Sequence, residues 1–133
     1  MENPTLDEII KSSKVVVRAG RYAYLTANET TIKNHFFISK DEDEITVITE
    51  EKNIPNVKYD KDVKWFKLIE IKVSLPFLAK GFLAKITKAI ADENLNILVV
   101  STFSKDYILV KEETNEIAIE ALRKIGFSVE VEK

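Results

Sequence analysis

Residues 75–110 read LPFLAKGFLAKITKAIADENLNILVVSTFSKDYILV, and this stretch decides the fold. It predicts a loop, a helix over 81–93, and two strands over 97–103 and 106–110 that are joined by a tight turn. The run at 97–103 is almost entirely apolar, which is typical of a central strand buried on both faces. Asn94 follows the helix, at a position where a left-handed backbone conformation is common and asparagine tolerates it.

The predicted helix has one apolar face. Its members recur at steps of four and three residues, the spacing that places side chains on one side of an α-helix. They are Ala79, Leu83, Ile86 and Ile90.

The flanking segments complete the pattern. In 65–75, apolar residues alternate with polar ones, which predicts a strand with one buried face. A second helix is expected over 114–125, and Gly126 stands where a helix end favours glycine. Residues 127–131 alternate again and predict a closing strand. The apolar stripe of the second helix comprises Ile117, Ala118, Ala121, Leu122 and Ile125.

The order β-α-β-β-α-β predicts an α+β, ferredoxin-like domain over 63–133, with both helices on one face of a four-stranded antiparallel sheet. Residues 1–62 are expected to contain one or two helical turns over 6–11 with Thr5 as the cap, several short strands and an acidic hairpin tip at 41–44, without a long helix. We expect them to form a β-rich, reduced copy of the same unit that packs against the ferredoxin-like domain, because so few strands bury little surface alone.

Composition excludes several classes of function. The 133 residues carry a formal net charge of −2 without a basic block, which argues against nucleic acid as a partner. The chain has no cysteine, so it has neither a disulfide nor a thiol nucleophile. No apolar run approaches about 18 residues, and residues 1–8 lack a signal-peptide core, so we expect a cytoplasmic protein without a membrane partner.

No catalytic or metal-binding motif is evident. His35 is the only histidine and lies within an aromatic run, so a structural role in a strand is expected. The acidic run 41–44 fits no calcium loop and reads as a solvated hairpin tip. Gly20, Gly81 and Gly126 are isolated and form no phosphate-binding loop. The sequence therefore predicts a non-enzyme with neither cofactor nor metal.

Two features have both a functional and a structural interpretation. The helix start near Gly81 offers free backbone N–H groups that attract a carboxylate, but Gly81 also suits a tight turn into the helix. Asp106 has the charge to bind a ligand's ammonium group, but an aspartate beside a turn also bonds its own backbone.

At these residues the chain resembles an ACT domain. The resemblance rests on Gly81-Phe82-Leu83-Ala84, on the helix end at 91–97, and on Ser101-Thr102-Phe103 with 106–110. It extends over 65–131. The chain is most similar to the subgroup with two ACT units per chain, such as the regulatory domains of aspartate kinases and the arginine sensors of the CASTOR type.

The resemblance implies an amino acid bound where two ACT units meet. We therefore expect a regulatory homo-oligomer, specifically a homodimer, rather than an enzyme. Lys105 stands where the family often has a small or apolar residue, which argues against arginine as the ligand because two cations repel. The implied ligand contacts are Leu78, Gly81, Phe82, Thr102, Phe103 and Asp106, with Ile45 and Thr46 from the first half.

Two other functions are compatible with the sequence. A structural module would dimerise through an open sheet edge without any ligand. An RNA-binding domain of the same fold would need aromatic side chains on the open sheet face, where 65–75 offers Glu70, Lys72 and Ser74 instead.

Overall fold

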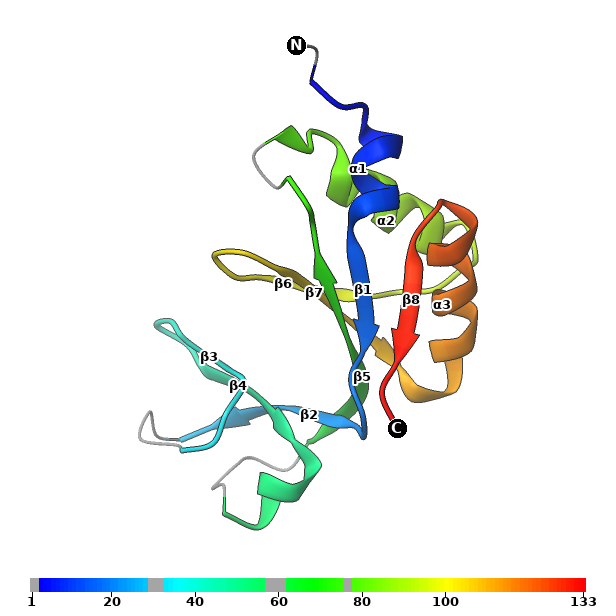
Figure 1. Cartoon of the computed structure of the whole chain (residues 1–133). Helices are drawn as coiled ribbons and strands as arrows, with labels where there is room; N and C mark the ends of the chain where they lie inside the picture. Colours follow the sequence, from blue (N-terminus) through cyan, green and yellow to red (C-terminus); the bar gives the residue numbers. More distant parts are fainter. Residues whose placement is uncertain (1–2, 29–32, 57–61, 76–77) are drawn as a thin grey trace. The chain divides into compact units, whose positions relative to one another are not determined.

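The computed structural model of the protein describes residues 3–28, 33–56, 62–75 and 78–133 (Figure 1). Contacts divide the chain into two compact units: unit 1 comprises Met1–Ala19 with Leu68–Lys133, and unit 2 comprises Gly20–Lys67. This grouping differs from a division after residue 62, because the N-terminal segment pairs with the C-terminal part of the chain. That residues 1–62 are a reduced ACT-like half stays a prediction.

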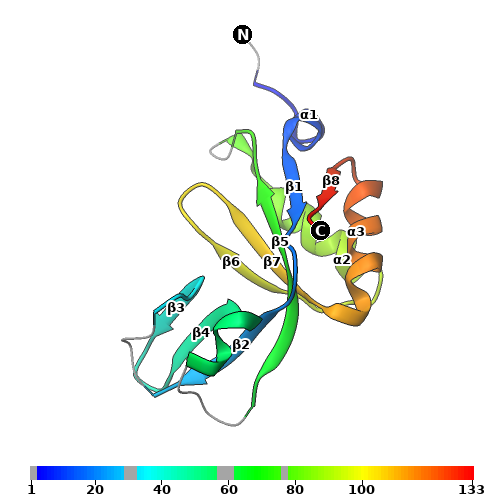
Figure 2. The ribbon, with the colours of Figure 1, turned by 60° about the horizontal axis from the view of Figure 1, so that its bottom comes forward.

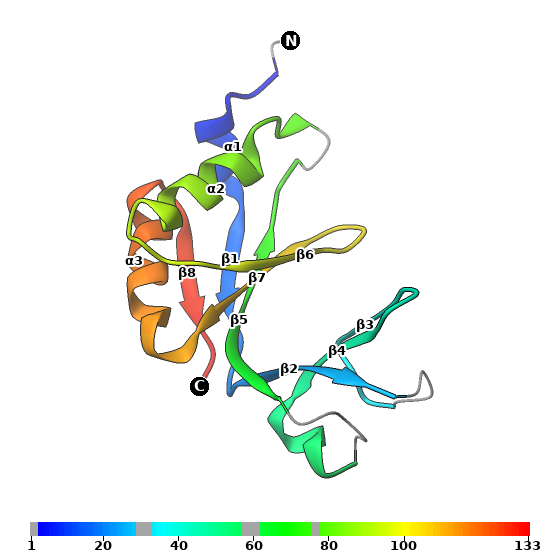
Figure 3. The ribbon, with the colours of Figure 1, turned by 180° about the vertical axis from the view of Figure 1, so that it is seen from behind.

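The described residues of unit 1 form three α-helices and a sheet with the strand order β8–β1–β5–β7–β6. Figures 1 and 3 show α2 and α3 on the same face of this sheet, as the sequence predicts. Its elements are α1 (Leu6–Ser12), β1 (Lys14–Val17), the second part of β5 (Lys64–Lys72), α2 (Phe82–Ala91), β6 (Leu98–Ser101), β7 (Asp106–Lys111), the short 3-10 turn η3 (Glu112–Thr114), α3 (Asn115–Lys124) and β8 (Ser128–Val131).

The α+β class and the order β5-α2-β6-β7-α3-β8 are confirmed, but the four-stranded sheet is wrong in one respect. Strand β1 lies between β5 and β8: it runs antiparallel to β5, with Val15 opposite Ile71, and parallel to β8, with Val15 opposite Val129. The sequence does not predict this insertion. A short run of valines indicates a strand, but it does not indicate which strands pair with it.

The hydrophobic core of unit 1 lies between the sheet and the helices. Ile69 and Ile71 of β5 face Ile86 and Ile90 of α2, and the side chains of all four are fully buried. The ring of Phe82 meets that of Phe127 edge to face, with centroids 5.8 Å apart. Among the described residues no helix is long and apolar enough to cross a membrane.

The buried faces of the two longer helices differ from the prediction at their edges. On α2, Phe82 is buried while Leu83 is 37% exposed, and on α3, Ile119 is buried while Ile117 is 45% exposed. Each predicted stripe was correct at its centre. Its edge depends on the angle at which the sheet meets the helix, which periodicity does not specify.

The sequence predicts a central strand over 97–103, and for β6 this prediction is wrong. Among the described strands β6 pairs only with β7 (Figure 2). Val99 of this strand is 41% exposed. A nearly unbroken apolar run is equally compatible with an edge strand, because β propensity reports a fit to a pleated surface rather than burial on both faces.

Local signals for helix ends are confirmed. Thr5 caps α1, where its Oγ1 accepts a hydrogen bond from the Glu8 N–H and the Glu8 carboxylate accepts one from the Thr5 N–H. Asn94 has a φ of 60°, so its backbone is left-handed after α2 as expected.

Unit 2 consists of β2 (Tyr22–Ala27), β3 (Phe37–Lys40), β4 (Ile45–Glu50), the 3-10 helix η1 (Glu51–Asn56) and the first residues of β5. The strand order is β3–β4–β2–β5, and all three pairings are antiparallel. The hairpin tip at 41–44 is confirmed, and the Asp41 carboxylate accepts the N–H groups of Asp43 and Glu44. His35 is exposed and precedes β3 rather than lying within it.

Candidate functional site

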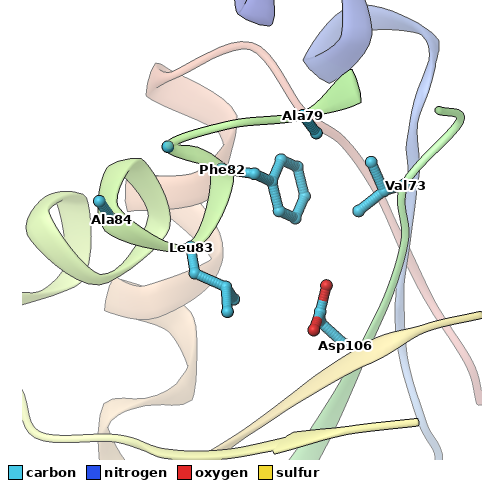
Figure 4. Close-up of a pocket in the computed structure, with 7 residues that line it drawn as sticks. Val73, Ala79, Phe82, Leu83, Ala84 and Asp106 are labelled. Atoms are coloured by element: carbon cyan, nitrogen blue, oxygen red, sulfur yellow. The ribbon is translucent and has the colours of Figure 1, made fainter. Parts of the chain in front are cut away.

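A pocket of about 290 Å³ opens in unit 1 beside the start of α2 (Figure 4). One wall is formed by the residue after β5, another by the loop before α2 and its first turn, and a third by the first residue of β7. Its described lining residues are Val73, Ala79, Gly81, Phe82, Leu83, Ala84 and Asp106. The pocket thus combines hydrocarbon walls with a single carboxylate.

The start of α2 supplies partial positive charge to this pocket. Gly81 is the N-cap residue and provides no side-chain cap. The Phe82 N–H donates to Ala79 O at 3.1 Å, whereas the N–H groups of Leu83 and Ala84 have no acceptor among the described residues. Uncapped N–H groups and the helix dipole together favour an anion at this end of a helix.

The backbone of Gly81 explains why glycine stands there. Its φ is 81°, in the left-handed region that other residues rarely adopt. A Cβ atom at this position would meet nothing nearer than Leu6 Cδ2, at 3.9 Å. The structure therefore accounts for Gly81 by the tight turn into α2, and the close approach of a ligand is not needed to explain it.

Asp106 is the first residue of β7 and is half-buried. The Ser101 hydroxyl donates to Asp106 Oδ1 at 2.5 Å, and the turn itself is closed by the Thr102 N–H, which donates to Lys105 O at 2.8 Å. Figure 4 shows the carboxylate directed toward Leu83 and Val73. Among the described residues, a backbone hydrogen bond therefore closes the turn, and the Asp106 carboxylate faces the pocket.

Lys105 does not accompany Asp106 into the pocket. Successive side chains of a strand point to opposite faces, and the Lys105 ammonium donates to Glu70 Oε1 at 3.1 Å on the other face of the sheet. The predicted argument against arginine, that Lys105 would repel a second cation, is therefore wrong, because this cation is paired elsewhere.

Glu70 is the centre of a charge cluster on that second face. Its Oε1 also accepts from Tyr107 Oη at 3.1 Å and from Arg18 Nη1 at 3.2 Å. Burial acts to raise the pKa of Glu70, but the hydrogen bonds from Lys105 and Tyr107 outweigh it, so this pKa lies below its usual value. The hydrogen bond to Glu70 likewise raises the pKa of Lys105.

This cluster makes stability depend on pH. A carboxyl whose pKa is lower in the folded state stabilises the fold above its unfolded pKa, about 4.3, and this contribution is lost as the pH falls through the folded pKa. We expect Glu70→Gln to lower the free energy of unfolding by about 1–3 kcal/mol at pH 7, because the buried Tyr107 hydroxyl and the partly exposed cations of Lys105 and Arg18 lose a charged acceptor. The difference in the free energy of unfolding between this variant and the unsubstituted protein should shrink toward pH 3.

Urea unfolding at pH 7, 5 and 3 measures this effect. The matched control is Glu130→Gln, since Glu130 forms an ion pair with Lys14 at 3.3 Å in which both side chains are largely exposed. Such a pair contributes at most about 1 kcal/mol. A Glu70→Gln deficit that is equal at all three pH values would contradict the assignment.

The other residues implied by the resemblance do not line this pocket. Thr102 lies in the turn between β6 and β7, Phe103 is 97% exposed there, and Leu78 is exposed in the loop before α2. Ile45 and Thr46 belong to β4 of unit 2, where they pair with Ala27 and Thr26 of β2. Their roles as ligand contacts stay predictions.

Two lining residues, Val73 and Ala84, were not identified as site residues from the sequence. Ala79 and Leu83 lie in the loop and helix start that the sequence singled out, but they were assigned to the buried face of the helix. A signal was present: these small and aliphatic residues flank Gly81 or end the preceding strand. Apolar residues at a helix start are so common in cores, however, that the pattern does not separate a pocket wall from packing.

Comparison with known proteins identifies the region that contains the pocket. Residues 63–124 match the model of the ACT domain family, which confirms the resemblance seen in the sequence. No curated protein sequence matches the chain.

Solved structures share the fold over nearly the whole chain. A Vibrio cholerae protein of unknown function, described as a possible transport protein, has a TM-score of 0.75 and 20% identity, with 91% of this chain and 95% of that chain covered. Protein Atu0741 of Agrobacterium tumefaciens has a TM-score of 0.68 and 22% identity, with 91% and 94% covered. The regulatory subunit of aspartate kinase from Thermus flavus has a TM-score of 0.62 and 9% identity, with 88% and 98% covered.

Proposed function

We propose that this chain, whose residues 63–124 match the ACT domain family, is a non-catalytic regulatory module that binds an amino acid. The observation that carries the proposal is the pocket beside α2, where the Asp106 carboxylate and the open N-terminus of the helix line the same cavity. The proposal includes action as a cytoplasmic homodimer, in which the ligand changes the affinity for a regulated partner.

Charge complementarity supports an amino acid as the ligand. A free amino acid carries an ammonium and a carboxylate on one carbon atom. Asp106 offers a strong acceptor for the ammonium, and the N–H groups of Leu83 and Ala84 offer donors for the carboxylate. A ligand with only one of these charges would use only half of this arrangement.

The names of structurally similar proteins point in the same direction. Besides the Thermus flavus protein, the similar structures include a putative C-terminal regulatory domain of aspartate kinase from Porphyromonas gingivalis, with a TM-score of 0.57 and 16% identity. Both names describe parts of a protein that regulate rather than catalyse. We propose the same division of labour here, with a separate partner as the regulated protein.

A thermal-shift screen of the full chain against the twenty amino acids tests this function. A ligand that binds only the folded state stabilises it by about 2.7 kcal/mol at a concentration of 100 times its Kd, which raises the melting temperature by several degrees. We expect at least one amino acid to do so at millimolar concentration. The absence of a shift with all twenty would overturn the proposal.

One observation favours a second candidate, a structural module that dimerises without a ligand. Strand β6 carries no charged residue and, among the described strands, has a partner on one side only. Edge strands of soluble monomers are usually protected by charges or prolines. Native mass spectrometry with and without amino acids separates the two candidates: the structural module predicts one oligomer whose stability does not respond to ligand.

A further inference from the structure

We infer that this pocket selects α-amino acids with apolar side chains, and that Leu83 is a determinant of that selection. The inference rests on the proposed function and adds the class of ligand. It follows from the chemistry of the walls rather than from the two charges that hold the backbone of the amino acid.

The described side chains that line the pocket are mostly hydrocarbon. Five of the seven described lining residues have purely hydrocarbon side chains, and Gly81 has none. Asp106 is the one charged side chain among them, and the ligand's ammonium occupies it. A polar or charged ligand side chain would therefore lose water without gaining a further side-chain partner from these residues, which costs more than burying a hydrocarbon of the same shape.

None of the described lining residues is a cation that could pair with an acidic ligand side chain. Lys105, the basic residue beside Asp106, is engaged by Glu70 on the opposite face of the sheet. A ligand with a carboxylate side chain would instead face the carboxylate of Asp106, and like charges repel. This argues specifically against aspartate and glutamate.

Two walls differ in rigidity. The Phe82 ring is buried and held against Phe127 at an interplanar angle of 86°, so it provides a fixed surface. Leu83 is 37% exposed at the rim, where it is in a position to cover the ligand's side chain. Figure 4 shows the Leu83 side chain extending toward Asp106. Of these two residues, Leu83 is therefore the one whose substitution disturbs the core less.

Calorimetric titration of the full chain with shape-matched amino acids tests the class of ligand. Leucine is compared with asparagine and aspartate, and methionine with glutamine, glutamate and lysine. We expect the apolar member of at least one set to bind about 10–100-fold more tightly than its polar counterparts. Tighter binding of a charged or amide amino acid overturns the inference but leaves the proposed function intact, whereas no binding by any of them overturns both.

A variant pair tests the role of Leu83. Leu83→Gln should reduce the ratio of apolar to polar affinity about tenfold, because the amide now solvates polar side chains. Ile117→Gln is the matched control, since Ile117 is an aliphatic residue of similar exposure on α3, outside the pocket. Circular dichroism confirms that both variants fold. An unchanged ratio in folded Leu83→Gln overturns the assignment of Leu83.

Discussion

Replacement of Asp106 by asparagine should remove most of the affinity for an amino acid. A hydrogen bond to a charged group is worth about 1.5–3 kcal/mol, and each 1.4 kcal/mol is a factor of ten in Kd. We therefore expect a loss of about 10–150-fold, measured by calorimetry or as the disappearance of the thermal shift. Asparagine keeps an oxygen that can accept the hydrogen bond from the Ser101 hydroxyl, so the β6–β7 hairpin should be retained.

The control for this variant is Glu113→Gln, which removes an exposed carboxylate in η3, outside the pocket. It should leave the affinity unchanged within about twofold, because surface charges several residues away are screened by salt. Full affinity in folded Asp106→Asn would show that the ammonium binds elsewhere. Equal losses in the two variants would instead indicate a general effect of net charge.

Ile86→Ala should be among the most destabilising single substitutions in the described core. Ile86 is fully buried on α2 between the sheet and α3, and removal of so many methyl and methylene groups leaves a cavity in a close-packed core. Such substitutions cost about 2–5 kcal/mol. Since domains of this size are stabilised by about 5–15 kcal/mol, urea unfolding should show a clear shift of the midpoint.

Leu83→Ala is the matched comparison, because it removes an aliphatic side chain from the same helix at a position that is 37% exposed. We expect a loss of stability below about 1 kcal/mol, together with weaker binding of apolar amino acids. The two variants thus separate the core face of α2 from its pocket face. Equal destabilisation by both would contradict the assignment of Leu83 to the pocket.

The position of Leu83 shows how far helical periodicity reaches. Steps of four and three grouped Leu83 with Ile86 and Ile90, and the grouping was correct for the two isoleucines. At the first turn, however, Phe82 and Leu83 are adjacent apolar residues, and both are compatible with the stripe. Packing against Phe127 selects Phe82 for the core and leaves Leu83 beside the pocket.

Asp106 and Lys105 show the same limit for a strand. The alternation of side chains along a strand predicts that neighbouring residues face opposite sides of the sheet. It does not predict which of the two faces the helices. The answer depends on Glu70 in β5, a residue 35 positions earlier in the chain, whose carboxylate binds Lys105. The sequence could therefore identify Asp106 as a candidate ligand contact. It could not show that Lys105, the residue beside it, is paired with Glu70 and so does not repel a cationic ligand.

Local patterns in the chain were enough to predict the order of helices and strands from residue 64 onward, the caps at Thr5 and Asn94, and a carboxylate beside a turn. These are local properties: side-chain spacing, backbone conformation and hydrogen bonds within a few residues specify them. The three-dimensional fold was needed to show that β1 enters the sheet between β5 and β8, and that Val73, Leu83 and Asp106 surround one pocket. Strand pairing and pocket walls bring together residues that are far apart in the chain. Local patterns do not specify which distant segments meet.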